Sequence, residues 1–216
     1  MNYQCEQLFF ESNNSFYIYK LYKGDSIVFK NSLPYNPSFI VFYGTVYIMK
    51  IFTNGESIFL VLLTSNSLLN FNSSNSNYAY YKVIALENTY LIKLYKLNSV
   101  NHLMYFSNVI NLLDLFYYTL KQYESSYYIL LHKSIKYRII QLLLLLCREF
   151  GILNSNYIII PFEISQKTLS HITGSNPTTV NKIINDLIRK LLIKYVVKKK
   201  ILICYFSFFQ YLDKFR

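Results

Sequence analysis

Over residues 16–97 the apolar positions fall in short runs rich in Tyr, Phe, Ile and Val, each followed by residues typical of turns. The turn stretches include KGD, NSLPYNP, TNGE and the Ser/Asn-rich NSLLNFNSSNSN. Gly24, Gly44 and Gly55 stand at or beside these turns, where a positive φ favours glycine. Short strands at intervals of about ten residues are typical of an antiparallel sandwich or roll.

Residues 99–132 carry a different pattern, in which apolar side chains are spaced alternately three and four positions apart. This spacing predicts a long helix with a coiled-coil seam. We expect the seam to be the interface of a homodimer, formed by Val109, Leu113, Phe116, Leu120, Tyr123 and Tyr127. The alternative is a helix packed only on its own β-domain. Both can hold, because one face can contact the domain and another a second copy.

From residue 133 the pattern predicts a helix, a strand, two short helices and a hairpin. The first helix, KSIKYRIIQLLLLLCREFGI, ends near Gly151, and NYIIIPFEI is strand-like. Ser165 is the predicted N-cap of the helix QKTLSHIT, and Gly174 is placed to end it in the left-handed conformation. LIKYVV and ILICYF, joined by Lys198 to Lys200, form the predicted hairpin, a wing with a basic tip.

The second short helix is predicted to begin with Asn176 as N-cap and Pro177 at its first position, where the missing N–H costs nothing. Its predicted buried face consists of Val180, Ile183, Ile184, Leu187 and Leu191. Its predicted outer face is polar and consists of Thr178, Thr179, Asn181, Lys182 and Asn185. Two short helices joined by a glycine turn, the second with a polar exterior, are typical of a helix-turn-helix.

A helix with this exterior suits the major groove of double-stranded DNA. We expect this helix to contact DNA through Ser175, Asn176, Thr178, Thr179, Asn181 and Lys182. We expect phosphate contacts around it from Lys133, Lys136 and Lys199, with Arg138, Arg189 and Lys190 as further candidates. The alternative is a common packing unit whose lysines are only a solvated face.

The charge distribution favours DNA binding. The net charge is +11, and residues 1–132 carry 8 Lys/Arg against 7 Asp/Glu, whereas residues 133–216 carry 14 against 4. A strongly basic region usually binds a polyanion. The Asn-, Lys- and Ile-rich composition, with two alanines and no Trp, is typical of an AT-rich genome.

Several classes of protein are disfavoured by what the sequence lacks. The aliphatic stretch LLLLLC is far shorter than the ~20 residues that cross a bilayer, and we find no signal-peptide pattern. Three widely spaced cysteines argue against a disulfide scaffold or a metal cluster, and favour a reducing interior. An enzyme is disfavoured because His102, His132 and His171 are far apart and no HExxH, GxSxG, P-loop or GxGxxG motif is present.

The order of roll, long helix and winged helix-turn-helix resembles the cyclic-AMP receptor protein superfamily of transcription regulators. More specifically, LLLLCREFG followed by TLSHITGSNPTTVNKIINDLIRKLLI resembles the global nitrogen regulator of cyanobacteria and of some algal plastids. The resemblance implies an α+β fold with an N-terminal antiparallel β-roll (cupin-like, cyclic-nucleotide-binding type) over residues 1–98. It implies a dimerisation helix over residues 99–132 and a C-terminal winged helix-turn-helix over residues 133–216.

The predicted recognition helix departs from the pattern of this superfamily, Ser-x-Arg-x-Thr-Val-x-Arg. Pro177 replaces the first arginine, and Lys182 replaces the second. Lysine still donates to guanine O6 and N7, although with less geometric rigidity. The resemblance therefore does not define the target sequence.

The effector site of the superfamily holds a cyclic nucleotide, or 2-oxoglutarate in the nitrogen regulators, through a glycine-containing cassette and arginine. Here Asn70 stands at the glycine position, while Ala79 and Thr119 align with the two arginines. Without arginine a buried dicarboxylate lacks charge compensation. We therefore expect effector control to be lost or altered and no cofactor to be bound. Lys82 is the candidate substitute, and Glu124 matches an acidic position of the family.

These observations together predict a soluble plastid protein that acts as a homodimeric, sequence-specific transcription regulator on palindromic promoter DNA. Its recognition helices would enter successive major grooves about 34 Å apart. The resemblance implies nitrogen-related control of plastid genes and RNA polymerase as a further partner. The alternative is a divergent sensor or interaction module that keeps the fold and has lost specific DNA recognition or effector response.

Overall fold

The computed structural model describes residues 17–29, 38–71, 78–94, 105–154, 156–196 and 200–204, with the backbone alone for 105–112 and 196. The chain divides into two compact units, Met1–Glu124 and Ser125–Arg216. The predicted boundary at residues 98 and 99 lies outside the described residues.

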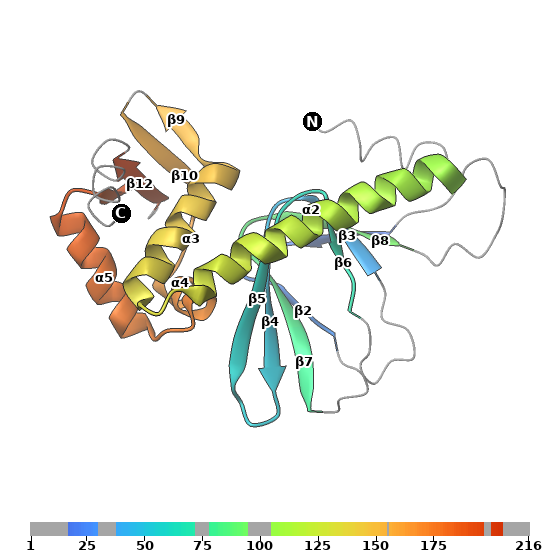
Figure 1. The fold of residues 1–216 in the computed structure, drawn as a ribbon, viewed down its shortest axis with the longest axis horizontal. Coiled ribbons are helices and arrows are strands. Elements are labelled where there is room, and N and C mark those ends of the chain that lie inside the picture. The colour runs from blue at the N-terminus through green and yellow to red at the C-terminus, as the bar shows by residue number, and fades with distance from the viewer. Residues whose placement is uncertain are drawn as a thin grey trace. The chain divides into compact units, whose positions relative to one another are not determined.

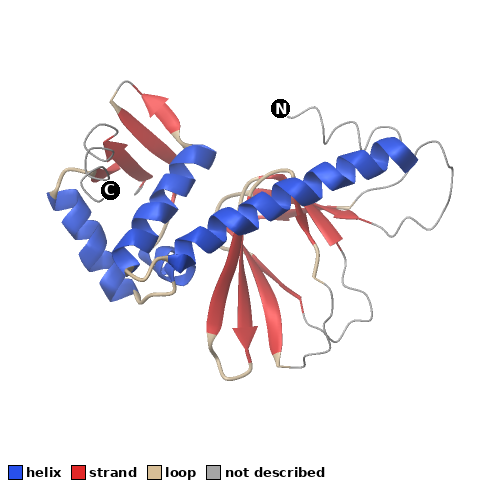
Figure 2. Ribbon diagram, in the orientation of Figure 1, coloured by secondary structure: helices blue, strands red, loops and turns tan. Residues whose placement is uncertain are grey.

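The first unit is a roll of two four-stranded antiparallel sheets, as predicted (Figures 1 and 2). One sheet has the order β1 (Ile18–Leu21), β8 (Thr89–Leu94), β3 (Ser38–Tyr43) and β6 (Ser67–Leu69). The other has the order β2 (Ser26–Phe29), β7 (Ala79–Ala85), β4 (Val46–Phe52) and β5 (Ser57–Leu63). Their inner faces form one apolar cluster, because side chains alternate between the two faces of each strand.

Glycine is required at the turn between β3 and β4. Gly44 has φ +91°, and a Cβ there would lie 2.7 Å from the carbonyl oxygen of Asn88. Gly24 and Gly55 also have positive φ, so the predicted role of all three is confirmed. Strand β6 lies in the Ser/Asn-rich stretch that the composition predicted as a loop, and that part of the prediction was wrong. Its three residues are buried, and β6 pairs with β3.

The long helix α2 (Tyr105–Leu131) carries two different stripes of side chains. One stripe is buried and mostly polar: Leu115, Thr119, Gln122, Ser126 and Ile129. In the first unit Leu115 packs on Ile40 and Leu68 of the roll. The other stripe is apolar and exposed: Leu113, Phe116, Leu120, Tyr123 and Tyr127. The helix therefore packs on its own unit mainly through a face other than the predicted seam. Tyr123 is the exception: it is only 36% exposed, and burial, together with Tyr81 of β7, raises the pKa of its hydroxyl.

The second unit consists of the end of α2, three further helices and a four-stranded antiparallel sheet (Figure 1). The helices are α3 (Ile135–Phe150), α4 (Gln166–Thr173) and α5 (Pro177–Arg189). The sheet has the order β11 (Ile193–Val196), β12 (Lys200–Cys204), β10 (Tyr157–Glu163) and β9 (Ile152–Asn154). Strand β9 was not predicted. Pro161 lies where the register of β10 against β12 shifts, which is where a strand tolerates proline.

The buried face of α5 consists of Val180, Ile184 and Leu187, all fully buried, with Ile183 half-buried. The predicted continuation to Leu191 was wrong, since that side chain is 63% exposed. Helix α5 ends at Arg189, and Leu191 takes a left-handed conformation with φ 56°. The Leu192 N–H then donates to the Leu187 carbonyl, as in a Schellman ending, and Leu192 is the side chain that enters the core.

Candidate DNA-binding site

The turn between α4 and α5 is fixed by local hydrogen bonds. Ser165 caps α4 by accepting from the Thr168 N–H, and Gly174 ends α4 with φ 61°, both as predicted. Asn176 caps α5: its Oδ1 accepts from the Thr179 N–H at 2.8 Å and from the Thr178 hydroxyl at 2.7 Å. Pro177 follows at the first helical position. The start of α5 is therefore set rigidly relative to α4.

Arg138 of α3 reinforces this turn. Its Nε donates to the His132 carbonyl at 2.8 Å, and its Nη1 donates to the Thr173 carbonyl at 3.0 Å. It thereby satisfies carbonyls at the end of α2 and at the end of α4, where helices leave acceptors without intrahelical partners. The sequence suggested Arg138 as a phosphate contact, whereas the structure places its guanidinium on these two carbonyls.

The outer face of α5 is polar and exposed. Thr178, Asn181, Lys182 and Asn185 are exposed, and Thr179 is half-buried. Ser175, the first predicted contact, is half-buried, and its hydroxyl bonds to that of Thr173 at 2.8 Å. Oδ1 of Asn176 is occupied by the cap. The residues of α5 that remain most available to a ligand are therefore those from Asn181 onward.

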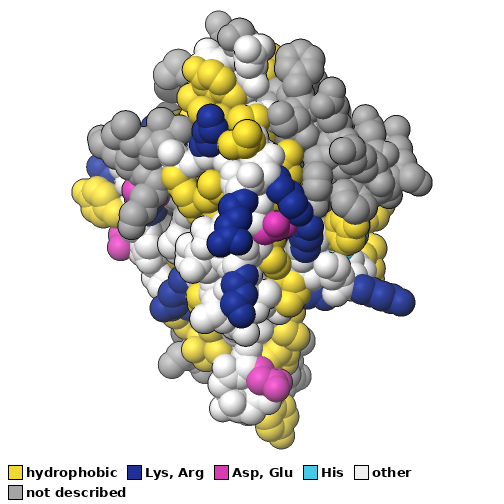
Figure 3. Space-filling view, turned by 90° about the vertical axis from the view of Figure 1, so that its left-hand side faces the viewer, with side chains coloured by type: hydrophobic (Ala, Val, Ile, Leu, Met, Phe, Trp, Pro, Cys, Tyr) yellow, Lys and Arg dark blue, Asp and Glu magenta, His cyan; other side chains and the backbone are white. Residues whose placement is uncertain are grey.

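Basic side chains lie around this face, and the face shown in Figure 3 carries several Lys and Arg side chains with few acidic groups between them. Lys133 is exposed. Lys136 lies 3.4 Å from Asp186, which also accepts from Lys190 at 3.0 Å. The hydrogen bond from Lys190, with the charges of Lys190 and Lys136, lowers the pKa of the Asp186 carboxyl. Asp186 thus partly neutralises two lysines of the site.

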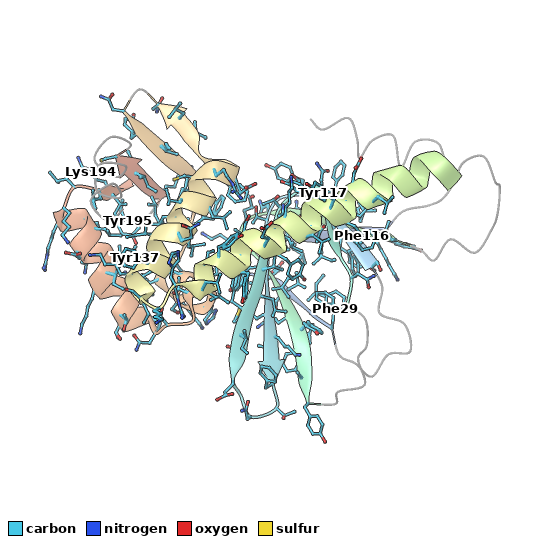
Figure 4. All side chains as sticks on the ribbon, in the orientation of Figure 1. Phe29, Phe116, Tyr117, Tyr137, Lys194 and Tyr195 are labelled. Carbon is cyan, nitrogen blue, oxygen red and sulfur yellow. The ribbon has the colours of Figure 1, made fainter. Side chains whose placement is uncertain are left out.

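The predicted basic tip of the hairpin lies partly outside the described residues, which include neither Lys198 nor Lys199. Lys194 of β11 is exposed and points away from the hairpin in Figure 4, which makes it a cation of this surface that the sequence did not single out. Its neighbour Tyr195 is 40% exposed, and partial burial raises the pKa of the Tyr195 hydroxyl.

Sequence reasoning also missed Gln166, the first residue of α4. Its Nε2 donates to Asn181 Oδ1 at 2.9 Å, across fifteen positions of sequence. Asn185 Nδ2 donates to the same oxygen at 3.2 Å. No sequence signal could have found this cluster, because it depends on the angle between α4 and α5.

The predicted dimer seam is exposed where the structure describes it. Leu113 and Leu120 are 60% and 64% exposed, and Phe116 projects from α2 (Figure 4). Val109 lies where side chains are not described. Contiguous exposed apolar side chains mark an interaction surface.

The described interior of the roll holds a group of packed aromatic rings among aliphatic side chains. Phe71 packs between Phe29 and Tyr81, with ring centroids 4.6 and 4.8 Å apart, and Phe29 also packs on Phe39. On β7, Lys82 lies between Tyr81 and Val83, whose side chains pack in the core of the roll. Because side chains alternate between the two faces of a strand, the side chain of Lys82 points away from the core. Among the described residues, no buried side chain carries a formal charge.

The position of the family's helix arginine has a different role here. Thr119 accepts from the Leu68 N–H at 2.8 Å and donates to the Leu115 carbonyl at 2.6 Å, so its hydroxyl joins α2 to β6. Nearby, Gln122 bonds to Thr64 and Ser67. Glu124 is exposed on α2. These residues do not fit an anionic effector, which would need a cation facing the interior.

The described residues contain no group of three or more His, Cys, Asp or Glu side chains able to hold a metal ion. No described helix is both long and apolar enough to cross a membrane.

Burial raises the pKa of Cys147 to about 12, which keeps this thiol protonated and poorly nucleophilic.

Comparisons with known proteins agree with this architecture. The family described as the Crp-like helix-turn-helix domain matches residues 137–207. Over 198 residues the chain is 32% identical to a protein of Porphyra purpurea named as the HTH-type transcriptional regulator ycf28, covering 90% of this chain and 81% of that protein. It is 24% identical over 189 residues to the global nitrogen regulator of Nostoc sp., covering 85% and 84%.

Among solved structures, the transcriptional regulator TTHA1359 of the CRP/FNR family from Thermus thermophilus has the same fold, with a TM-score of 0.64 at 18% identity. The match covers 87% of this chain and 93% of that one. This architecture is that of a DNA-binding transcription regulator: a roll, a long helix and a helix-turn-helix whose second helix is exposed. The chain belongs to the Crp-like family of helix-turn-helix transcription regulators.

Proposed function

We propose that this protein is a homodimer that binds palindromic promoter DNA in a sequence-specific way and that needs no small-molecule effector to do so. The observation that carries the proposal is the outer face of α5. This face is polar, exposed and rigidly placed by the Asn176 cap and by the Arg138 hydrogen bonds. A helix presented in this manner fits the major groove, which admits one α-helix.

The homodimer is supported by the exposed apolar stripe of α2. Leu113, Leu120 and Tyr127 are each at least 60% exposed, so a second copy can cover them, while Leu115 packs on the roll from another face of the helix. Two-fold symmetry would then present two α5 helices to half-sites one helical turn apart, and the DNA site would be palindromic.

Effector independence is supported by the roll. Aromatic rings occupy its interior, Thr119 bonds to β6, and Lys82 faces away from the core. The buried bonds of Thr119 and Gln122 hold α2 on the roll without any added group. Binding of 2-oxoglutarate or of a cyclic nucleotide would require the rings to move and a charge to be desolvated.

The cellular setting follows from the relatives and the composition. The similarity to the global nitrogen regulator supports nitrogen-related control, and the AT-rich type of composition supports a plastid gene. RNA polymerase is a proposed partner, as for other regulators that activate promoters.

The second candidate function is an interaction module without specific DNA recognition. It is favoured by Pro177, which stands at the position of the family's first arginine.

Selection from a random duplex library distinguishes these functions. Purified protein without added ligand should enrich a palindrome whose half-site centres are 10 to 10.5 base pairs apart, about one helical turn. Lys121→Gln removes a cation from α2, outside the helix-turn-helix, and should enrich the same sequence. Recovery of no common motif, or of a motif without two-fold symmetry, would contradict the proposal and favour the interaction module.

A further inference from the structure

Three amide side chains form a connected group on the exposed surface between α4 and α5. Gln166 Nε2 and Asn185 Nδ2 both donate to Asn181 Oδ1, at 2.9 and 3.2 Å. A carbonyl oxygen has two lone pairs, so these two bonds use the acceptor capacity of Asn181. The bonds also fix the orientation of all three amides before any ligand is present.

The group therefore presents a defined set of donors and acceptors to solvent. Asn181 offers the two N–H groups of Nδ2. Gln166 offers Oε1 and Asn185 offers Oδ1, since each already donates through its nitrogen. The donor of Asn181 and the acceptor of Asn185 thus belong to the face of α5 that the proposed function directs into the groove, and the acceptor of Gln166 is held to this face from the start of α4.

This combination matches one base edge. In the major groove adenine presents an acceptor, N7, beside a donor, the N6 amino group. Guanine presents the acceptors N7 and O6, and a carbonyl oxygen held opposite O6 would be repelled. Thymine presents an acceptor and a methyl group, and cytosine presents a donor alone. Only adenine pairs with a donor and an acceptor held side by side.

We propose that Asn181 donates to N7 of an adenine in each half-site while Gln166 or Asn185 accepts from its N6 amino group. The inference rests on the proposed function, because it requires α5 to enter the major groove. It gives this chain a specificity that the arginine-based pattern of its superfamily does not supply. Residues 177–184 contain one cation, Lys182, so base contacts from the first two turns of α5 depend largely on neutral side chains such as Asn181.

Other polar residues of the helix are less able to perform this role. Asn176 Oδ1 and the Thr178 hydroxyl are engaged in the N-cap, and Ser175 is half-buried against Thr173. Asn181 is exposed and lies one position after the buried Val180. A purely structural role would make the amide group a clip between α4 and α5, and that role predicts a change in stability with no change in base preference.

The test uses the full-length wild-type protein and the duplex that it prefers. Each adenine of one half-site is replaced in turn by 7-deazaadenine, which lacks the N7 acceptor, or by purine, which lacks the N6 amino group. One adenine should be sensitive to both replacements, with a loss of about tenfold or more in affinity. At that position Asn181→Ala should bind the natural and the modified duplexes equally. Asn154→Ala, an exposed asparagine of β9, is the control and should behave as wild type.

Each outcome has one meaning. If wild type prefers no duplex over a scrambled one, the proposed function fails and Asn181 is not the reason. If wild type is specific but no adenine is sensitive to both replacements, the adenine inference is overturned and the proposed function stands. If Asn181→Ala weakens all duplexes equally, or lowers only the melting temperature, Asn181 contacts phosphate or clips the helices, and the inference is again wrong. The wild-type measurements decide the matter even if the variant does not fold.

Discussion

The two units of this chain use their polar side chains in opposite ways. In the first unit, buried polar groups bond within the protein. Gln122 bonds to Thr64 and Thr119 accepts from the Leu68 N–H, which joins α2 to the end of β5 and to β6. In the second unit, the polar groups of α5 remain exposed on a helix whose ends are fixed. Under the proposed function, the roll serves as a scaffold and the helix-turn-helix recognises the ligand.

The first test concerns the exposed apolar stripe of α2, where the expected change is in the oligomeric state itself. Replacing Leu113 and Leu120 by lysine together should give monomers by light scattering, because charges in a packed seam are costly. Affinity for a palindrome should fall by about a hundredfold or more, since the effective concentration supplied by the second subunit is lost. Asp114→Lys adds a positive charge outside the stripe and should leave the dimer intact. Dimers that persist in the double variant would place the interface elsewhere.

The scaffold role of the roll is tested by opening its interior. Phe71 is 6% exposed and packs against two rings, so Phe71→Ala should lower the free energy of unfolding by about 3–5 kcal/mol. Urea denaturation measures the change. The matched control, Tyr78→Ala at a side chain that is 73% exposed, should change little. A loss below about 1 kcal/mol for Phe71→Ala would mean that these rings do not form a packed core.

The fixed placement of α5 is tested at Arg138. Arg138→Met keeps the apolar stem and removes both donors, and it should cost about 1.5–3 kcal/mol because two carbonyls lose a charged partner. Arg148→Met removes an exposed pair with Glu149, and it should cost at most about 1 kcal/mol. Thermal unfolding compares the two variants. Equal, small losses would show that the Arg138 bonds do not hold the turn.

The substitution Lys182→Ala distinguishes a contact to a base from a contact to the phosphate backbone. If Lys182 reads a base, Lys182→Ala should weaken specific binding by about 1–3 kcal/mol and hardly change binding to a scrambled duplex. Fluorescence anisotropy on both duplexes provides the measurement. A parallel fall on the two duplexes would assign Lys182 to the phosphate backbone.

The smallest effect is expected at Asp186, whose carboxylate is exposed. The pKa of the Asp186 carboxyl is lower in the folded protein than its ordinary value of 3.8, so the carboxylate stabilises the folded state at pH values above 3.8. This stabilisation is lost as the pH falls from 3.8 through the folded-state pKa. Asp186→Asn should therefore reduce stability at pH 7 by no more than about 0.5 kcal/mol after screening, and melting temperatures of the two proteins should converge at low pH.

The same substitution has a second readout. It removes the negative charge beside Lys136 and Lys190, so binding to any duplex should become tighter and its salt dependence steeper. Weaker DNA binding by Asp186→Asn would contradict the placement of these two lysines at the site.

The second unit could be predicted closely because its signals are local. Ser165, Gly174, Asn176 and Pro177 each specify a helix end through the conformation or hydrogen bond of one residue, and all four behave as their types require. Leu191 escaped prediction because the apolar period continues past the end of α5, and the period alone does not include the Schellman ending.

The remaining features depend on contacts between distant residues. Strand β6 is buried by its pairing with β3, although its surroundings in the sequence are typical of a loop. The role of Arg138 and the Gln166–Asn181 bond require the angle between helices, which no spacing encodes. The heptad spacing did locate the exposed stripe of α2, since that stripe is a property of one helix.

The most direct test of the account is the binding of purified protein to its palindrome and to a scrambled duplex, by fluorescence anisotropy at low and moderate salt without ligand. We predict a preference of tenfold or more for the palindrome, about 1.4 kcal/mol, that 2-oxoglutarate or a cyclic nucleotide does not change. Equal and steeply salt-dependent binding to both duplexes, or a preference that requires the ligand, would contradict it.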